Sequence, residues 1–383
     1  MKTAIIHEWL LSYAGSEKVL KHIINLYPEA DLFSILDFLP DGNRGFILDK
    51  KVNTSFIQKL PFAKSKYRSY LALMPFAVKN LDLSGYDLII SSSHTVAKGL
   101  RKRPGQLHIS YCHTPMRYIW DLESQYLKET GMDKGIKSTL LKAFFNKLRK
   151  WDVSTAKSVD FFIANSNYIK DRIHRVYNRD ATVIHPPVEI EDFQIKTGRE
   201  EFYITVSRMV PYKKVDLIVQ AFSSIGLPLI VVGDGPDYNK VRKQAGKNIA
   251  LMGYLRDDVM KIYLQKARAF IFAAEEDFGI SPVEAQACGI PVIAFERGGI
   301  RDTVTPLRDI GAKNQSRNIA PPTGIFFNEQ TPSSLIRAVK MFQTVEDQFD
   351  PHAIRRNAEK FNVDRFRINF KSFVNEKVKE FFE

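Results

Sequence analysis

The sequence predicts an α/β protein with two doubly wound, Rossmann-like domains, each a parallel sheet covered by helices on both faces. Its length of 383 residues exceeds the size at which one hydrophobic core usually stops growing. Apolar runs rich in Ile, Val, Phe and Leu recur along the chain with helical patterns between them, as is typical of strands buried in a parallel sheet. The composition, 44% apolar and 26% charged, is that of an ordinary globular protein.

The strand-like runs form two groups of four, one in each half of the chain. They occupy residues 2–7, 87–93, 107–113 and 160–166, followed by 202–208, 227–235, 268–274 and 289–296. Pro186 and Pro187 break regular structure where acidic residues replace apolar ones, which favours a domain boundary. We therefore predict an N-terminal domain over 1–190, a C-terminal domain over 191–355 and a helix over 356–383 that returns to the first domain. The two domains are expected to face a central cleft, because ligands usually bind in clefts.

The net charge of +13 is concentrated in the first half, where residues 1–187 hold 28 Lys/Arg against 17 Asp/Glu. Residues 134–150 are typical of a basic amphipathic helix, with one apolar face made of Ile136, Leu140, Phe144 and Leu148. Such a helix favours peripheral contact with an anionic membrane, together with the apolar segment 60–78. The alternative is a helix packed on its own domain with a solvated basic face.

Other partners and compartments are constrained by composition. The basic residues are spread through the first half and match none of the RNA or DNA modules, so no nucleic acid partner is expected. Cys112 and Cys288 lie in apolar runs, as buried free thiols do, which fits a reducing compartment. The first fifteen residues are too short and too polar for a signal peptide or a membrane span. We expect a cytoplasmic protein, with peripheral contact at the inner face of the membrane as the open alternative.

The most informative segment is EEDFGISPVEAQACGIPVIAF, residues 275–295. Ser281 is a candidate cap of a helix, and Glu284 stands where a capping-box glutamate would. The backbone amides of Gly279 and Ile280 would then lie at a helix N-terminus, which suits phosphate oxygens. The competing interpretation is structural: Glu284 caps its own helix, and Glu276 is a solvated loop charge.

This segment resembles the retaining glycosyltransferases of family 4, which have the two-domain fold called GT-B. Their hallmark is two glutamates separated by seven residues, and Glu276 and Glu284 satisfy it. The resemblance implies that Glu276 holds hydroxyls of a donor sugar and that Glu284 holds the nucleotide ribose. A carboxylate suits both tasks because it accepts two strong hydrogen bonds at once. The resemblance also implies donor contacts at Phe278, Gly279, Ile280 and Ser281.

A second resemblance lies in residues 206–222, VSRMVPYKKVDLIVQAF. It implies that Arg208 and Lys213 neutralise the donor diphosphate, where fixed cations stabilise the charge that builds on the leaving phosphate. The family usually has glycine where this chain has Lys214, so either lysine is a candidate. The alternative is a pair of surface lysines.

The turn after the strand at 227–235 carries Gly233, Asp234 and Gly235. Such turns connect many α/β units, so a structural turn competes with Gly235 as a donor-binding residue. No GxGxxG fingerprint accompanies it, which argues against a dinucleotide dehydrogenase. The resemblance also implies contacts of Tyr254 and Leu255 with the nucleotide base.

In the first half, Gly15 follows the first strand and precedes a helical pattern with Ser16 as candidate cap. Family members commonly carry a glycine pair there, of which this chain keeps one, and a glycine lets the backbone approach a phosphate. His113 directly follows a buried strand, and the His-Thr-Pro run resembles mannosyltransferases that hold the sugar with a histidine. A structural histidine is the alternative. Arg117 and Asp121 are candidates for the acceptor side.

The family resemblance leads to a mechanism and a donor. No Asp-x-Asp pair and no clustered His/Cys spacing occur, so neither a metal nor another cofactor is expected. The favoured route transfers the sugar on the same face, and the departing phosphate helps to deprotonate the acceptor. The run His-Thr-Pro-Met-Arg-Tyr-Ile-Trp-Asp, residues 113–121, resembles bacterial GDP-mannose-dependent mannosyltransferases of surface polysaccharide synthesis. This implies GDP-mannose as donor and a saccharide or lipid-linked saccharide as acceptor. The alternatives are a UDP- or ADP-linked sugar, or a nucleotide-sugar-binding protein without turnover.

Overall fold

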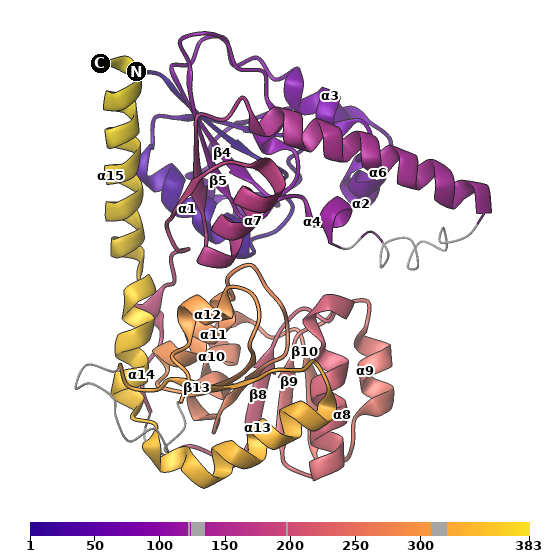
Figure 1. Cartoon of the computed structure of the whole chain (residues 1–383), viewed down its shortest axis with the longest axis vertical. Coiled ribbons are helices and arrows are strands. Elements are labelled where there is room, and N and C mark those ends of the chain that lie inside the picture. The colour runs from indigo at the N-terminus through magenta and orange to yellow at the C-terminus, as the bar shows by residue number, and fades with distance from the viewer. Residues whose placement is uncertain (122, 124–134, 197, 308–319) are drawn as a thin grey trace. The chain divides into compact units, whose positions relative to one another are not determined.

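The computed structural model describes residues 1–121, 123, 135–196, 198–307 and 320–383. The chain divides into two compact units, each around its own sheet (Figure 1). Unit 1 comprises Met1–His185 with Phe366–Glu383, and unit 2 comprises Pro186–Arg365. All strand pairs within both sheets are parallel, so the predicted α/β class with two Rossmann-like domains is confirmed.

The sheet of unit 1 has the strand order β3-β2-β1-β4-β5-β6-β7. Its strands are β1 Thr3–His7, β2 Asp31–Ser34, β3 Val52–Thr54, β4 Leu88–Ser93, β5 Leu107–Cys112, β6 Phe161–Ala164 and β7 Ala181–Val183. The helices of this unit are α1 Gly15–Leu26, α2 Ala63–Lys66, α3 Met74–Lys79, α4 Arg117–Trp120, α6 Gly135–Ala156, α7 Asn167–Tyr177 and α15 Val363–Phe382, the last entering from unit 2.

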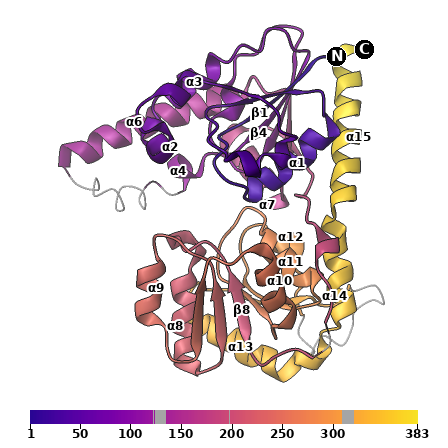
Figure 2. The same cartoon turned by 180° about the vertical axis from the view of Figure 1, so that it is seen from behind.

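Side chains of β1 alternate between the two faces of this sheet, as the period of a strand requires. Ile5 packs with residues of α1 and with three phenylalanines of α15, namely Phe366, Phe370 and Phe373. Ala4 and Ile6 pack on the other face with residues of α3 and α6. Helix α15, yellow in Figures 1 and 2, accordingly lies beside α1 in both views. Covering helices on both faces explain why β4 and β5 are buried at every position.

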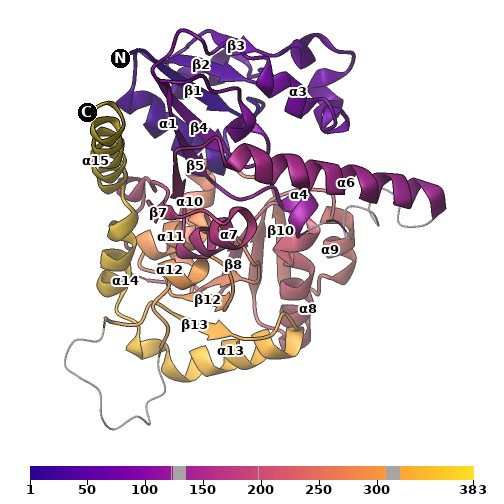
Figure 3. The same cartoon turned by 45° about the horizontal axis from the view of Figure 1, so that its top comes forward.

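The sheet of unit 2 has the order β10-β9-β8-β11-β12-β13. Its strands are β8 Tyr203–Val206, β9 Leu229–Val232, β10 Ile249–Gly253, β11 Phe270–Phe272, β12 Val292–Phe295 and β13 Gly324–Phe327. Its helices are α8 Val215–Ile225, α9 Tyr238–Gln244, α10 Asp257–Lys266, α11 Ile280–Ala287, α12 Ile300–Thr303, α13 Pro332–Val345 and α14 Pro351–Ala358. Helices α8 and α13 pack on one face, with α13 along β13 in Figure 3, and α10 and α11 cover the other.

The C-terminal segment changes units at one point. Ala358 and Phe361 belong to the core of unit 2, whereas Phe366 begins the run that packs on unit 1. The contacts divide the chain at 185/186 and 365/366, whereas the boundaries predicted from the sequence are 190/191 and 355/356.

The basic segment 134–150 falls mostly within α6. Phe144 is half-buried and Leu148 is buried in the core of unit 1, while the side chains of Ile136 and Leu140 lie outside the described residues. The described apolar face therefore packs on its own domain, as the alternative interpretation held. Within the residues that the structure covers, no helix combines the length and apolarity needed to cross a membrane.

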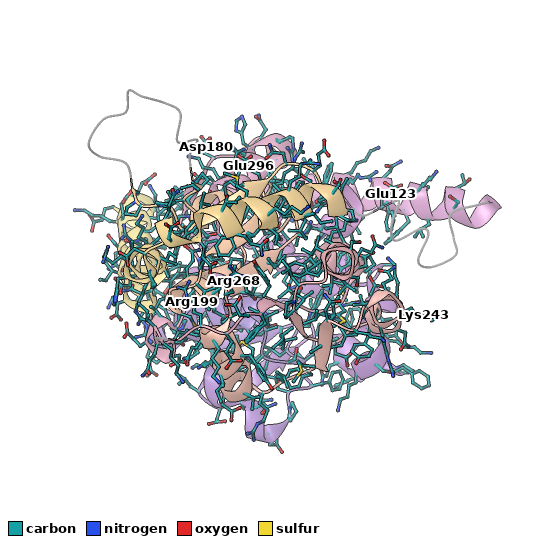
Figure 4. The ribbon with its side chains drawn as sticks, turned by 90° about the horizontal axis from the view of Figure 1, so that it is seen from below. Glu123, Asp180, Arg199, Lys243, Arg268 and Glu296 are labelled. Carbon is teal, nitrogen blue, oxygen red and sulfur yellow. The ribbon has the colours of Figure 1, made fainter. Side chains whose placement is uncertain are left out.

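Several basic residues of unit 2 stabilise the amino-terminal edge of its sheet. Arg268, labelled in Figure 4, precedes β11 and donates from Nε to Glu346 at 2.7 Å and from Nη1 to Glu201 at 3.1 Å. Arg199, also labelled, donates to the carbonyl of Gly289 and precedes β8. These cations are engaged in hydrogen bonds at the amino-terminal edge of the sheet, whereas ligands of parallel α/β sheets usually bind outside the carboxyl ends of the strands.

Candidate functional site

The loops after β8, β9 and β10 are joined by backbone hydrogen bonds at the carboxyl edge of the unit 2 sheet. The amide of Met209 donates to the carbonyl of Asp234 at 2.9 Å, and the amide of Gly233 donates to Gly253 at 2.8 Å. A Cβ on Gly233 would stand 1.9 Å from the carbonyl oxygen of Ser207, and one on Gly235 would stand 2.4 Å from that of Met209. Close packing against the β8 loop therefore requires glycine at both positions.

The two predicted phosphate-binding cations follow β8 on this edge. Arg208 is exposed, and Lys213 is half-buried at the end of a short 3₁₀ turn, Pro211–Lys213. Lys214 caps α8 with φ 56°, the left-handed region that favours glycine. This conformation explains why glycine suits the position where the chain departs from its family.

Lys213 forms an ion pair with Glu276, which lies 63 positions later in the loop after β11. Both side chains are largely shielded from solvent, with 20% and 15% of their surface exposed. The structure thus brings together the residue predicted to meet the phosphate and the residue predicted to meet the sugar, and the interpretation of Lys213 and Glu276 as solvated surface charges is wrong.

The backbone of Glu276 is held by a glycine pair that the sequence analysis did not single out. Gly299 donates its amide to the carbonyl of Glu276 at 2.8 Å, and Gly298 forms a β-bridge with the same residue. A Cβ on Gly298 would stand 2.2 Å from that carbonyl oxygen, and one on Gly299 would stand 2.4 Å from the carbonyl oxygen of Asp277. The available signal was the pair of adjacent glycines, which follows β12 after two intervening residues.

Helix α11 begins earlier than the capping pattern predicts. Its N-cap is Gly279 at φ 90°, with no side-chain cap, so the predicted cap at Ser281 and the capping box with Glu284 are both wrong. The left-handed glycine turns the chain sharply into the helix, which a serine cap would not do. Glu284 is consequently an interior helix residue with 7% exposure, and its burial has to be explained by something other than capping. Burial, reinforced by this carboxylate, raises the pKa of the Cys288 thiol to about 12.

The other predicted donor contacts of unit 2 differ in exposure. The ring of Phe278 is buried in the core against Phe361 at 5.5 Å, so only its backbone can face a ligand. Ile280 and Ser281 are half-buried on the first turn of α11. Tyr254 is 77% exposed, and Leu255 packs partly on the core.

In unit 1 the carboxyl ends of β1, β4 and β5 carry a buried polar network. Ser92 Oγ lies 2.8 Å from His113 Nε2 and 3.1 Å from His7 Nδ1, and His7 Nε2 lies 3.2 Å from Glu17 Oε1. Glu17 Oε2 accepts from the amide of Ala14 at 3.1 Å. His113, predicted at this edge, is therefore joined to the loop of Gly15, the other predicted residue of this half.

A second buried carboxylate, Glu8, holds the loop after β4. It accepts from the backbone amides of residues 94–97 at 2.6 to 3.1 Å and from Ser93 Oγ at 3.2 Å. Burial would raise the pKa of Glu8, but His94 and these amides hold it below its usual value. Sequence reasoning missed His7, Glu8, Glu17 and Ser92, although polar residues at the end of apolar strand runs were the available signal.

The electrostatics favour a neutral His113 at one end of this network and an ionised Glu17 at the other. Burial of the imidazole, with His94 and His7 nearby, lowers the pKa of His113 well below its usual value. Burial opposes ionisation of Glu17, yet the hydrogen bond from His7 holds the pKa of this carboxyl below its usual range. The candidate cap Ser16 is a further correction, since α1 has Ala14 at its N-cap and Gly15 as its first residue.

The two residues predicted for the acceptor side are engaged with each other. Asp121 forms ion pairs with Arg117 at 3.8 Å and with the buried Arg172 of α7. Arg172 also donates to the carbonyl of Pro115 at 3.3 Å. This cluster stabilises the loop after His113, and a contact of Arg117 or Asp121 with an acceptor stays a prediction.

Two family models match the chain, one after the other. Residues 35–192 match "Glycosyltransferase Family 4", and residues 188–361 match "Glycosyl transferases group 1". The chain belongs to glycosyltransferase family 4. The resemblance drawn from the glutamate pair is thereby confirmed.

Curated relatives of this glycosyltransferase include mannosyltransferases. The O-antigen chain mannosyltransferase RfbU of Salmonella typhimurium is 30% identical over 171 residues, which cover 42% of this chain and 48% of the relative. A GDP-mannose-dependent monoacylated alpha-(1-6)-phosphatidylinositol monomannoside mannosyltransferase of Corynebacterium glutamicum is 29% identical over 219 residues, covering 47% and 56%. The glycosyltransferase thus spans about half the length of these relatives.

Among solved structures, the complex of Anabaena HepE with UDP superposes with a TM-score of 0.68. The alignment covers 98% of this glycosyltransferase and all of the other chain at 16% identity. At that identity the likeness concerns the fold, and it confirms the predicted GT-B class.

Proposed function

We propose that this glycosyltransferase moves mannose from GDP-mannose to a saccharide or lipid-linked saccharide acceptor, with retention of the anomeric configuration, in surface polysaccharide synthesis. The observation that carries the proposal is the ion pair between Lys213 and Glu276. A donor whose phosphate meets Lys213 would have its sugar beside Glu276, and these are the roles that family membership implies. Glu284 is buried on α11 and does not cap its helix, so we assign its carboxylate to hydrogen bonds with the nucleotide ribose.

In the proposed reaction the bond between the sugar C1 and the β-phosphate oxygen breaks, and the electron pair stays on the phosphate. Lys213 and Arg208 stabilise this developing charge. The acceptor hydroxyl forms the new bond to C1 on the same face and passes its proton to the departing phosphate. Side-chain cations supply the positive charge in this scheme, so turnover should need neither a metal nor a cofactor and should be unchanged by EDTA.

The choice of mannose rests on the relatives, since they include the two mannosyltransferases described above, one of which is GDP-mannose-dependent. A UDP-sugar is the rival, because HepE was crystallised with UDP. A thermal-shift panel of GDP, UDP and ADP with their sugar conjugates separates them, since a ligand at a hundred times its Kd stabilises a fold by about 2.7 kcal/mol. Stabilisation by GDP and GDP-mannose alone is expected, and a response to UDP alone would overturn the donor assignment.

Turnover and stereochemistry need separate measurements. Acceptor-dependent release of GDP is expected from a transferase, whereas a binding protein would release none. The one-bond carbon–proton coupling at C1 of the product distinguishes α- from β-mannoside. The α-product is expected from GDP-α-mannose, and a β-product would exclude retention.

We also propose that unit 1 places the enzyme at the inner, cytoplasmic face of a membrane through residues 56–79. Four apolar side chains on this segment are exposed, with Phe62 at 72% and Phe76 at 61%, together with Phe56 and Leu73. The sequence between residues 50 and 81 contains seven Lys or Arg and no Asp or Glu. Apolar residues among cations suit an anionic bilayer, to which each basic residue near the surface contributes about 1 kcal/mol.

Sedimentation with vesicles tests this surface. Binding to vesicles with 30% phosphatidylglycerol but not to pure phosphatidylcholine is expected, and Phe62→Ala with Phe76→Ala should weaken it. Ile368→Ala, which removes a similarly exposed apolar side chain from α15, is the matched control. Equal binding of all variants would exclude residues 56–79 as the contact.

A further inference from the structure

The polar network of unit 1 is a single hydrogen-bonded series that ends on His113. It runs from Glu17 through His7 and Ser92 to His113 Nε2, with heavy-atom distances of 3.2, 3.1 and 2.8 Å. The three residues behind His113 are buried, with exposures of 5% for Glu17 and 0% for His7 and Ser92. Water therefore does not compete for these bonds, and each proton in the series is assigned by its neighbours.

The assignment starts at Glu17, because an ionised carboxylate only accepts hydrogen bonds. Glu17 Oε2 already accepts from the Ala14 amide at 3.1 Å and from Ser16 Oγ at 3.0 Å. Glu17 Oε1 then accepts from His7, so the proton of a neutral His7 lies on Nε2. His7 Nδ1 is left with a lone pair directed at Ser92.

Ser92 has one proton to donate, and His7 Nδ1 takes it. The hydroxyl oxygen of Ser92 must therefore accept from His113, which places the proton of His113 on Nε2. Nδ1 of His113 then carries a lone pair. The rings of Tyr111 at 5.1 Å and His94 at 6.3 Å pack against His113, and within the described part of the chain no hydrogen bond to its Nδ1 occurs.

We propose that Glu17, His7 and Ser92 are positioning residues that fix His113 as the Nε2-protonated tautomer, so that its Nδ1 accepts a hydrogen bond from a hydroxyl of the donor sugar. The inference rests on the proposed function for the identity of the sugar. It adds the direction of the hydrogen bond, because His113 Nδ1 can only accept a hydrogen bond that a sugar hydroxyl donates. Glu17 also holds the amide that precedes Gly15, so one carboxylate orders both predicted ligand elements of unit 1.

The first test needs no donor. Long-range ¹H–¹⁵N correlation spectra of the ligand-free protein at neutral pH report the protonation of each imidazole nitrogen, and His113→Gln assigns the signal. A protonated Nε2 and a bare Nδ1 are expected for His113. A protonated Nδ1, or averaging between the two tautomers, would overturn the relay and leave the proposed transferase activity standing.

The second test uses one substitution, Glu17→Gln, to reverse the donor and acceptor of each hydrogen bond in the series. The amide oxygen has to face the Ala14 amide, so the amide NH₂ faces His7 and donates to Nε2. The proton of His7 moves to Nδ1, Ser92 then donates to His113, and His113 Nδ1 becomes a donor. We expect the tautomer of His113 to switch and kcat/KM for the donor to fall on the order of tenfold to a hundredfold, since a mismatched buried hydrogen bond costs about 1 to 3 kcal/mol.

Controls separate the relay from general damage and from failure of the proposed function. Glu29→Gln makes the same chemical change at an exposed position of unit 1 and should leave kcat/KM and the spectrum unchanged. Ser92→Ala breaks the series and should give averaged tautomers. If Glu17→Gln keeps kcat/KM while His113→Ala lowers it, the relay is wrong and the sugar contact stands. If His113→Ala keeps kcat/KM as well, the sugar contact itself is wrong.

Discussion

The candidate sites of the two units consist of different kinds of chemical groups. The edge of unit 2 is made of loops, glycines and cations, and its residues are arranged by backbone contacts such as those of Gly233 and Gly298. The edge of unit 1 is made of buried side chains that hydrogen-bond across 85 positions of sequence, as His7 does with Ser92. Seven of the eight histidines lie in unit 1, and His352 is the single one in unit 2. The comparison indicates that unit 2 suits a phosphate by charge, whereas unit 1 suits hydroxyls by directed hydrogen bonds.

The largest effect is expected from the charged pair of unit 2. Lys213→Ala and Glu276→Ala should each lower kcat by about a hundredfold or more, as should Arg208→Ala, because each would remove a group that we propose to contact the donor in the transition state. Steady-state kinetics with GDP-mannose measures this. Lys240→Ala breaks an exposed ion pair with Asp216 in the same unit and should leave kcat unchanged. Near-normal rates for the first three variants would exclude these charged residues of unit 2 from catalysis.

A large loss of stability is expected from Glu8→Gln in unit 1. The side-chain amide would direct N–H groups at backbone amides of residues 94–97 that now donate to the carboxylate. Unfolding free energy should fall by about 3 kcal/mol, the range for a broken buried charged network. Urea unfolding followed by tryptophan fluorescence reports on unit 1, because Trp9, Trp120 and Trp151 all lie there. An unchanged midpoint would show that this loop does not depend on Glu8.

Acidification should weaken unit 1 through His108. Burial, with Lys102 and Lys98 nearby, lowers the pKa of His108 to about 3, so below pH 6.5 the unfolded chain binds a proton that the folded one does not. The stability due to the neutral His108 is thus fully present above pH 6.5 and decreases by about 1.4 kcal/mol per pH unit as the pH falls toward 3.

The unfolding free energy from tryptophan fluorescence at pH 6.5 and pH 5 measures this slope. His108→Gln should reduce it, whereas His352→Gln, at an exposed position of unit 2, should not. An identical slope in both variants would exclude His108 as the titrating group.

The smallest effect concerns Lys214, which sits at φ 56° before α8. Lys214→Gly relieves a left-handed conformation that costs a side-chain-bearing residue about 1 to 2 kcal/mol, so the melting temperature should stay level or rise. Activity should be retained, because Lys213 is the lysine that pairs with Glu276. A loss comparable to that of Lys213→Ala would instead assign the phosphate contact to Lys214.

The residues of unit 2 could be predicted better from the sequence than those of unit 1. Arg208, Lys213, Glu276 and Glu284 could be named as candidates from the sequence because each stands in a short segment whose residues are close in sequence. The start of α11 was misplaced because Ser281 and Glu284 fit a capping pattern, while the left-handed Gly279 that begins the helix is fixed by its surroundings. Glu8 and Glu17 were missed because a buried carboxylate is recognised only with its partners, and those of Glu8 are more than 80 positions away.

The sequence by itself determined two parallel α/β domains, the family and the charged residues of unit 2, because strand periodicity and loop motifs are local properties of the chain. Only the tertiary structure decided that Lys213 meets Glu276, that Glu284 is buried without capping its helix, and that His113 ends a series of buried hydrogen bonds. The physical reason is that burial removes water as a partner, so the direction of each bond depends on side chains that folding brings together from distant strands.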